Sequence, residues 1–293
     1  MNIDQILRVD QRPDSPLTVQ LSGVPPFVID LGYKTNEWHR ANGQAPGIEP
    51  FESEIFVELL SAAPRVLDIG ANAGWCSCIA SAVSGGRARV HAFEPEHNNF
   101  VLLGRNAGLN AFHGIIPHQV ALGADDGRAN LFLNAENSGD HRLSNARSDE
   151  AIEVGIAKLD TVLSSQYFIP DLVKIDVQGA ELQVFDGAEK TFARAGRSMA
   201  VLMEFQPEAL GLDTSHALAD RIFSFNRPVF MVHPFEGNQL QPLKLDVLHD
   251  AIEGCMHPRF DVHSDLVIAP EDDRFERLRR WFDGARDWAQ WEY

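Results

Sequence analysis

Residues 66–77, VLDIGANAGWCS, carry the strongest indication of the fold. The stretch starts with apolar residues typical of a buried strand, which ends in Asp68, and it continues into a turn that contains Gly70 and Gly74. Apolar residues then recur at helical spacing, which predicts a helix over residues 75–83. A strand, a glycine-containing turn and a helix in this order indicate an α/β fold that binds a ligand at the turn.

The turn does not match the loops that bind phosphate groups. A P-loop would end in Gly-Lys-Ser or Gly-Lys-Thr, and a dinucleotide fingerprint would read GxGxxG with no acid at the end of the strand. Asp68 stands where a pyrophosphate would approach, and its charge would repel phosphates. A neutral or cationic ligand fits better, and S-adenosylmethionine, which has a sulfonium, an ammonium and no phosphate, is such a ligand.

A second strand pattern, ARVHAFEP at residues 88–95, ends in Glu94 after enough chain for one crossover helix. A carboxylate at this strand end can accept hydrogen bonds from both hydroxyls of a ribose. Asp68 or Glu94 alone could be a strand-end or helix-cap acid. Together, with the glycines between them, they favour the cofactor site.

Composition and charge restrict the class of protein. With 293 residues and 44% hydrophobic content, the chain fits one elaborated globular domain, residues 48–293, preceded by an N-terminal arm, residues 1–47. The net charge of −17 argues against a nucleic acid partner, because binding to phosphates needs clustered Lys and Arg. The sequence has neither a signal-peptide pattern nor an apolar run of membrane-spanning length, so we expect a cytoplasmic protein and no membrane partner.

Strand and helix patterns alternate along the chain. Strand patterns occur near residues 26–31, 66–68, 90–93, 114–122, 172–176, 199–205 and 264–270. Helix patterns occur at residues 49–60, 75–83, 96–110, 179–192 and 271–293. Residues 128–135 and 150–159 predict an inserted hairpin, and residues 227–235 and 239–245 an antiparallel pair. Pro117 favours an edge or a break in its strand. The last helix has an apolar side that suits internal packing or a homodimer interface.

Three separated stretches resemble one family: VLDIGANAGWCS, VHAFEPEHNNFVLLGRNAGLN, and LDTVL followed by DLVKIDVQGAELQVFDGA. They resemble the FkbM family of S-adenosylmethionine-dependent methyltransferases, over about residues 49–270. The resemblance implies a Rossmann-like, doubly wound, mixed sheet of seven strands with an antiparallel last strand, the class I methyltransferase fold. One departure is Gln178, where the family has Glu, and it removes a negative charge.

The resemblance also implies a site for the cofactor S-adenosylmethionine. The methionine part would lie near the turn, the ribose at Glu94, the adenine near Pro95 and the turn at residues 121–122, and the ammonium near Glu52. The expected cofactor residues are Glu52, Asp68, Gly70, Asn72, Gly74, Glu94, Pro95 and Ala121.

Lys174 and Asp176 are candidate catalytic residues. They are two positions apart in a strand, so they point to the same face, although a strand buried on both faces should be apolar. One interpretation is a structural ion pair. In the other, Asp176 orients or deprotonates the acceptor, and Lys174 keeps Asp176 ionised. Glu204 closes the next strand and is a second candidate at a ligand-binding edge.

His141 is the candidate histidine, because it lies in the polar run between the hairpin strands and a near-neutral imidazole suits a base. Arg142 beside it is a solvated residue or binds a carboxylate or phosphate of the substrate. Glu181 suits the first turn of a helix regardless of function. Asp176 and Glu204 could instead hold a divalent cation that binds two substrate oxygens, but two oxygen ligands with no third do not favour a metal.

The resemblance implies an O-methyltransferase that acts on a hydroxyl of a small molecule, such as a sugar, a polyketide or another secondary metabolite. The residues themselves imply only a site for a sulfonium cofactor with acids nearby. Hydroxyl acceptors must lose a proton, which accounts for the candidate bases. Two alternatives stay open: N-methylation of a peptide amide or amine, and a scaffold that binds the cofactor without turnover.

Overall fold

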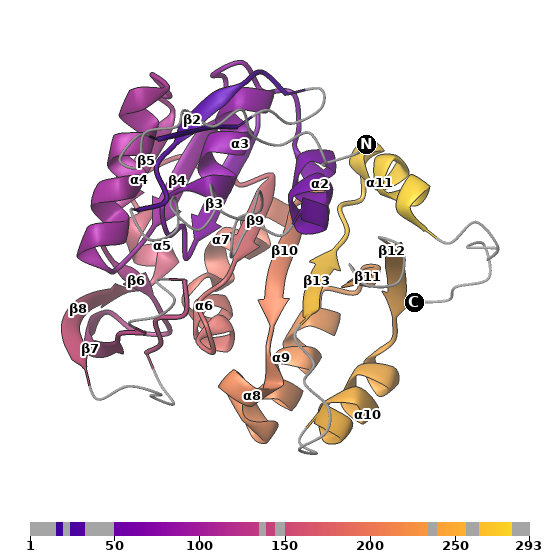
Figure 1. Ribbon diagram of the computed structural model, residues 1–293. Coiled ribbons are helices and arrows are strands. Elements are labelled where there is room, and N and C mark those ends of the chain that lie inside the picture. Colours follow the sequence, from indigo (N-terminus) through magenta and orange to yellow (C-terminus); the bar gives the residue numbers. More distant parts are fainter. Residues whose placement is uncertain are drawn as a thin grey trace.

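The computed structural model describes residues 16–19, 24–32, 50–134, 139–143, 150–233, 239–255 and 264–282 (Figure 1). Its strands are β1 (Leu17–Val19), β2 (Phe27–Ile29), β3 (Arg65–Ile69), β4 (Arg89–Phe93), β5 (Ile115–His118), β6 (Ala121–Leu122), β7 (Gly127–Phe132), β8 (Ala151–Ala157), β9 (Leu172–Ile175), β10 (Ala200–Phe205), β11 (Val229–His233), β12 (Gln239–Leu243) and β13 (Ser264–Ile268). Its helices are α2 (Pro50–Leu59), α3 (Trp75–Val83), α4 (His97–Leu109), α5 (Leu159–Val162), α6 (Glu181–Gly187), α7 (Glu189–Ala195), α8 (Pro207–Leu210), α9 (Leu212–Phe223), α10 (Leu245–Cys255) and α11 (Asp273–Leu278). Two 3-10 turns, η2 (Gly196–Ser198) and η3 (Arg279–Trp281), complete them.

The described residues form a central sheet of eight strands in the order β12-β11-β13-β10-β9-β3-β4-β5. Neighbours from β10 to β5 are parallel, whereas β13 is antiparallel to both β10 and β11. The predicted antiparallel last strand and the predicted antiparallel pair β11–β12 are confirmed. Seven strands match the class I methyltransferase sheet that the resemblance implies, and β12 adds an eighth at the edge.

The predicted inserted hairpin is present, and it belongs to a separate sheet. Strands β7 and β8 pair antiparallel, and β6 joins β8 to give the order β6-β8-β7. Residues 114–122, expected as one strand, divide into β5 and β6. Pro117 lies in β5, at the edge of the central sheet and just before this division, as its missing N–H group predicts.

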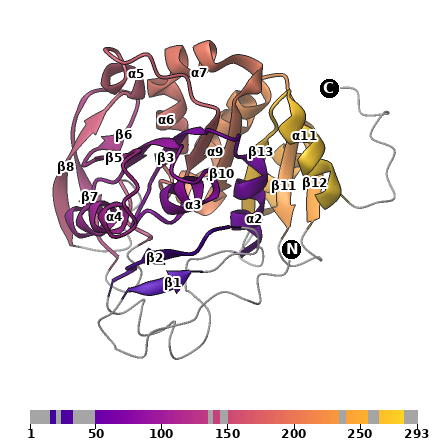
Figure 2. The ribbon, with the colours of Figure 1, turned by 90° about the horizontal axis from the view of Figure 1, so that it is seen from above.

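Two layers of helices cover the sheet, as the view from above shows (Figure 2). Helices α2, α3 and α4 lie on one face together with β1 and β2, and α5, α6, α7 and α9 lie on the other. Each face has its own apolar cluster, and the strands carry buried side chains toward both. This two-sided burial explains why the central strands have near-continuous apolar sequences.

The described part of the N-terminal region is tied to α4. The Asn106 side chain accepts from the N–H of Asp30 at 2.7 Å and donates to its carbonyl at 2.9 Å. Asn110 makes the equivalent pair of bonds with Val28, at 2.7 Å and 2.5 Å. Two asparagines thus bond to β2 and the residue after it as a neighbouring strand would. The boundary between residues 47 and 48 stays a prediction, because residues 33–49 lie outside the described residues.

The helix predicted over residues 179–192 is in fact two, α6 and α7, which meet at Ala188. Asp160 of α5 accepts hydrogen bonds from the N–H groups of Lys190 and Thr191, both at 2.8 Å, and so caps the start of α7. At Gly187 a Cβ would lie 2.1 Å from the carbonyl oxygen of Gly123. The chain therefore breaks where Gly123 packs closely against Gly187 and where Asp160, from another segment, caps the next helix.

The C-terminal helix pattern also gives shorter elements, α11 and η3. Leu278 and Phe282 are buried against the α2 side of the sheet, which is the internal packing that the apolar spacing allowed. Residues 283–293 of the predicted helix lie outside the described residues. A homodimer interface stays a prediction.

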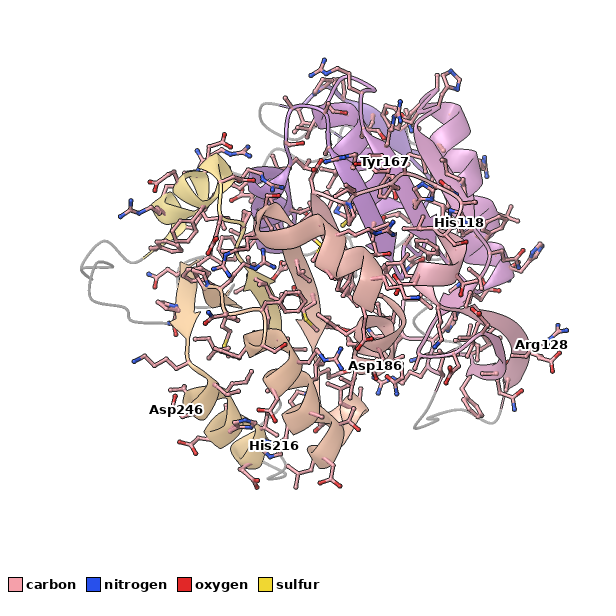
Figure 3. The ribbon with its side chains drawn as sticks, turned by 180° about the vertical axis from the view of Figure 1, so that it is seen from behind. His118, Arg128, Tyr167, Asp186, His216 and Asp246 are labelled. Carbon is pink, nitrogen blue, oxygen red and sulfur yellow. The ribbon has the colours of Figure 1, made fainter. Side chains whose placement is uncertain are left out.

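Helices α9 and α10 lie side by side at the lower edge of the view from behind, where His216 and Asp246 are labelled (Figure 3). His216 and His249 connect them, with their Nδ1 atoms 2.5 Å apart. None of the helices in the described ranges combines the length and the apolar character that crossing a bilayer requires.

Candidate active site

A cavity of about 700 Å³ lies at the carboxyl ends of β3, β4, β9 and β10. Parallel strands end at the same edge of a sheet, and ligands of open α/β folds bind there. Eleven of the twelve residues predicted from the sequence line this cavity: Glu52, Asp68, Gly70, Asn72, Glu94, Pro95, Ala121, His141, Lys174, Asp176 and Glu204. The structure thus brings together residues from both ends of a long stretch of sequence.

Gly74 is the predicted residue that does not line the cavity. It precedes α3 with φ of 88°, and a Cβ there would lie 2.5 Å from Cδ1 of Leu103 in α4. Its position is therefore explained by the turn conformation and by close packing of α3 against α4.

The turn after β3 is held by the end of β4. The N–H groups of Gly70 and Ala71 both donate to the carbonyl oxygen of Phe93, at 3.0 and 2.9 Å. Asn72 has φ of 49°, and its N–H group donates to Glu94 Oε2 at 2.9 Å. The loop conformation and the Glu94 carboxylate consequently depend on each other.

Asp68 is buried at the bottom of this turn, with 1% of its surface exposed. Its Oδ2 accepts hydrogen bonds from the N–H and the hydroxyl of Ser77, at 3.0 and 2.6 Å. Its Oδ1 is buried without a hydrogen-bond partner among the described residues. Burial raises the pKa of Asp68, and a ligand that donates a hydrogen bond or brings a positive charge would satisfy this oxygen.

Glu94 is buried and accepts two backbone hydrogen bonds, from Asn72 at 2.9 Å and from Glu96 at 2.9 Å. Burial raises the pKa of Glu94 to about 7, against these hydrogen bonds, which favour the ionised form. The sequence predicted the position of this carboxylate, but not that one of its oxygens also fixes the neighbouring turn.

Lys174 and Asp176 form an ion pair inside the cavity, with Nζ 2.9 Å from Oδ2. The same Nζ donates to the carbonyl oxygen of Gly70 at 3.1 Å, which connects β9 to the turn after β3. Burial opposes ionisation of Asp176, but Lys174 and the hydrogen bonds to the carboxylate outweigh it, and its pKa is lowered. Burial would likewise lower the pKa of Lys174, but Asp176 and Asp68 outweigh it and raise that pKa.

Gln178 bridges the two carboxylates at the ends of β9 and β10. Its Nε2 atom donates to Asp176 Oδ1 at 2.8 Å and to Glu204 Oε2 at 2.5 Å. The sequence marked Gln178 as a departure from the family pattern, but nothing in it showed that the side chain lies between these acids. Across the described residues, no group of three or more His, Cys, Asp or Glu side chains is arranged to hold a metal ion.

His141 faces the cavity from the segment between β7 and β8. The N–H group of Asn134 donates to its Nδ1 at 3.0 Å, and burial lowers the pKa of the ring. A neutral ring that accepts at Nδ1 carries its proton on Nε2. In this arrangement His141 offers a hydrogen-bond donor from Nε2.

Arg142 is buried beside it and lines the same cavity. Its Nε donates to Asp140 Oδ1 at 2.6 Å and its Nη2 to Gln206 Oε1 at 3.2 Å. Asp140 and Gln206 also line the cavity and were not identified from the sequence. The position of Gln206, two residues after Glu204, was a usable signal, because it follows the end of a central strand.

Acidic side chains outnumber basic ones around the cavity. The acids are Glu52, Asp68, Glu94, Asp140, Asp176, Glu204 and Asp265, and the bases are Arg142 and Lys174. Such a lining favours neutral or cationic ligands and repels polyanions.

Glu181 is the first residue of α6, which confirms its predicted place in the first turn of a helix, and 1% of its surface is exposed. Both of its carboxylate oxygens accept from the N–H of Gly179, at 3.0 and 3.1 Å, and burial raises its pKa to about 7.

The raised pKa of Glu181 predicts a pH-dependent stability. Because the folded-state pKa lies above the ordinary value, the contribution of Glu181 to stability is complete below about pH 4.5 and is lost as pH rises through about 7. Glu181→Gln should therefore lose less stability between pH 5 and pH 8 than the wild type, by roughly 2 to 3 kcal/mol.

Urea unfolding of both proteins at the two pH values measures this difference. Glu189→Gln, which changes the exposed acid in the first turn of α7, is the matched control and should follow the wild type. Equal pH dependence in the wild type and Glu181→Gln would show that Glu181 does not titrate as described.

A comparison with protein families places the chain. The model of the methyltransferase FkbM domain matches residues 68–227, more than half of the 293 residues. The chain belongs to the FkbM methyltransferase family. The match begins at the Asp68 turn and includes the Glu94 strand end, the Lys174–Asp176 pair and Glu204. It thus covers most of the cavity lining, and it implies S-adenosylmethionine as the methyl donor of the family.

Several solved structures have a similar architecture. The precorrin-6y C5,15-methyltransferase from Geobacter metallireducens is 12% identical, with 74% of this chain and 85% of that chain covered and a TM-score of 0.40. A SAM-dependent O-methyltransferase from Thermotoga maritima is 10% identical, with 84% and 74% covered and a TM-score of 0.40. An rRNA methylase from Streptococcus thermophilus is 8% identical, with 78% and 100% covered and a TM-score of 0.41. Similarities of this size do not bear on the substrate, and no curated protein matches the chain.

Proposed function

We propose that this FkbM-family chain is an S-adenosylmethionine-dependent O-methyltransferase that acts on a hydroxyl group of a small molecule. The observation that carries the proposal is that two carboxylates, Asp176 and Glu204, lie at the carboxyl ends of adjacent strands in the cavity that also contains the Asp68 turn and Glu94. A cofactor site and a candidate proton acceptor therefore open into one space.

The residues present fit this cofactor. The unpartnered Oδ1 of Asp68 suits a cationic or hydrogen-bond-donating ligand, and Glu52 lines the same cavity near the turn. Glu94 would accept from the ribose hydroxyls, and Pro95 and Ala121 would flank the adenine. When bound, the cofactor supplies a methyl carbon that is already activated for displacement.

The protein's own part in the reaction is to orient the acceptor and remove its proton. A hydroxyl group of the acceptor would lose its proton to the Asp176–Glu204 pair as its oxygen accepts the methyl group. Lys174 keeps Asp176 ionised, and so it keeps the pair able to accept a proton. We assign His141 to donation of a hydrogen bond from Nε2, in place of the base predicted from its sequence context.

The negative charge of the cavity lining favours a methyl acceptor that carries little or no negative charge. Carboxylates surround the space, and Lys174 is engaged by Asp176 and by Gly70. A nucleic acid backbone would bring phosphates against this lining and against a chain of net charge −17. A sugar, a polyketide or another hydroxylated metabolite fits these conditions.

Calorimetric titration with S-adenosylmethionine and S-adenosylhomocysteine tests the cofactor assignment. The wild type should bind both with affinities in roughly the micromolar range, and Asp68→Asn should bind at least about tenfold more weakly. The substitution keeps an oxygen for Ser77 but places an amide nitrogen where the ligand needs an acceptor.

Asp213→Asn is the matched control, because Asp213 is an exposed acid in the first turn of α9, and it should bind as the wild type does. No binding of either compound by the wild type would refute the proposed function. Binding followed by formation of S-adenosylhomocysteine only with amine acceptors would refute O-methylation while leaving the methyltransferase intact.

A further inference from the structure

The conformation of Gln178 is unusual for its residue type. Its backbone has φ of 55°, in the left-handed region that non-glycine residues rarely adopt, and Gly179 follows with φ of 102°. The residue is buried at 9% exposure and lines the cavity. A strained backbone in a ligand cavity is a reason to ask what the side chain does there.

The side chain places one donor between two acceptors of like charge. Nε2 lies 2.8 Å from Asp176 Oδ1 and 2.5 Å from Glu204 Oε2, so both amide hydrogens are used by the two carboxylates. Two neighbouring carboxylates repel each other when both are ionised. They are held together by a shared proton, by a bridging cation, or by a donor group that contacts both.

A divalent cation held between Asp176 and Glu204 would compete for the oxygens that the amide uses. The amide nitrogen offers a metal no lone pair, and the amide oxygen would face the cation only if both hydrogen bonds to the carboxylates were broken. Lys174 already supplies a positive charge on the opposite oxygen of Asp176, at 2.9 Å. The two carboxylates are thereby fixed on one side by an ammonium and between them by an amide. Lys174 thus supplies the positive charge that a metal ion would bring, and Gln178 supplies the contact that would bridge the two carboxylates.

We propose that Gln178 is a positioning residue that holds Asp176 and Glu204 together as one proton-accepting pair and occupies the place of a bridging divalent cation. The role of the pair rests on the proposed function, whereas the bridging does not. It follows that residue 178 decides whether this cavity binds a divalent cation: glutamine excludes the cation, and a carboxylate in its place creates the site.

Binding of Mn²⁺ to the full chain tests this inference, with Gln178→Glu as the main variant. The exchange puts a third carboxylate beside Asp176 and Glu204, and carboxylates are the ligands that Mn²⁺ and Mg²⁺ prefer. Titration calorimetry, or the electron paramagnetic resonance signal of free Mn²⁺, should show at least about tenfold tighter binding than in the wild type. The melting temperature of the variant at pH 8 should rise with added Mn²⁺, while that of the wild type should not.

Gln206→Glu is the matched control. Gln206 lines the same cavity and contacts Arg142, so the variant adds the same charge without touching the carboxylate pair, and it should gain no Mn²⁺ affinity. Gln178→Met removes only the bridging donor and serves if the first variant folds poorly. It should bind Mn²⁺ more tightly than the wild type does, because the two carboxylates then lack their bridge.

Two results would overturn the inference: binding of Mn²⁺ by the wild type as tightly as by Gln178→Glu, or an equal gain in the two glutamate variants. Titration of the same samples with S-adenosylhomocysteine reports on the cofactor site separately. No binding of S-adenosylhomocysteine by the wild type would refute the proposed function. The comparison of Mn²⁺ affinities would still decide the role of Gln178.

Discussion

Gly70→Ala is expected to prevent the chain from forming a stable native state. The backbone at Gly70 has φ of 76°, and a Cβ there would lie 1.8 Å from the carbonyl oxygen of Asp176. The obstacle is backbone at the end of β9, so no side-chain movement can relieve it, and β3 would have to separate from β9. We expect a loss of about 4 kcal/mol or more in the free energy of unfolding, measured by urea denaturation and by soluble yield.

Gly104→Ala is the control for this prediction. Gly104 is exposed in α4 and has open space where its Cβ would be, so the substitution should be neutral or should stabilise the helix by up to about 1 kcal/mol. A Gly70→Ala protein as stable as the control would show that the turn and β9 do not approach each other this closely.

Lys174→Met is expected to destabilise the protein by about 3 kcal/mol at pH 8. The change removes the cation that faces Asp176 and Asp68 and leaves carboxylates uncompensated in the cavity. Asp176 is 35% exposed, so solvent screens part of the repulsion and the loss is smaller than for a fully enclosed pair.

The pH dependence of this loss separates charge from packing. In the wild type the lowered pKa of Asp176 gives stability above the ordinary pKa of an aspartate, which is lost as pH falls through the folded-state value. Without Lys174, burial raises the pKa of Asp176 and further raises that of Asp68, so these carboxylates of the variant take up protons as pH falls. The deficit of the variant should therefore be large at pH 8 and should shrink toward pH 4. Lys190→Met, at an exposed position of α7, should change stability by less than about 0.5 kcal/mol. A deficit equal at both pH values would mean that Lys174 acts through its aliphatic stem alone.

The turn after β3 was predictable because its determinants are local. Apolar spacing gave a helix over residues 75–83, and α3 has these bounds. The acids Asp68, Glu94, Asp176 and Glu204 were predicted to share one site, because each ends a strand pattern and parallel strands end at one edge of a sheet. Their convergence in one cavity confirms that geometry, while their roles stay proposals.

Other features depend on residues that are distant in sequence, and they were missed. The break between α6 and α7 is stabilised by Asp160, which caps α7 from another helix. The pairing of β12 with β11 was predicted, but a central sheet of eight strands instead of seven was not. Residues 207–223, which form α8 and α9, were assigned no structure, although α9 packs against α6 and α10.

The class of fold, the acids at the strand ends and the family could be inferred from the amino-acid sequence, because they follow from periodicity and from motifs within single segments. The ionisation and hydrogen bonding of the site residues depend instead on contacts that form only in the folded chain. Burial raises the pKa of Glu94 to about 7, the Asn134 N–H group makes His141 a donor, and Gln178 links Asp176 to Glu204. Hydrogen bonds and desolvation act over a few ångströms, and only the folded chain brings these groups that close together.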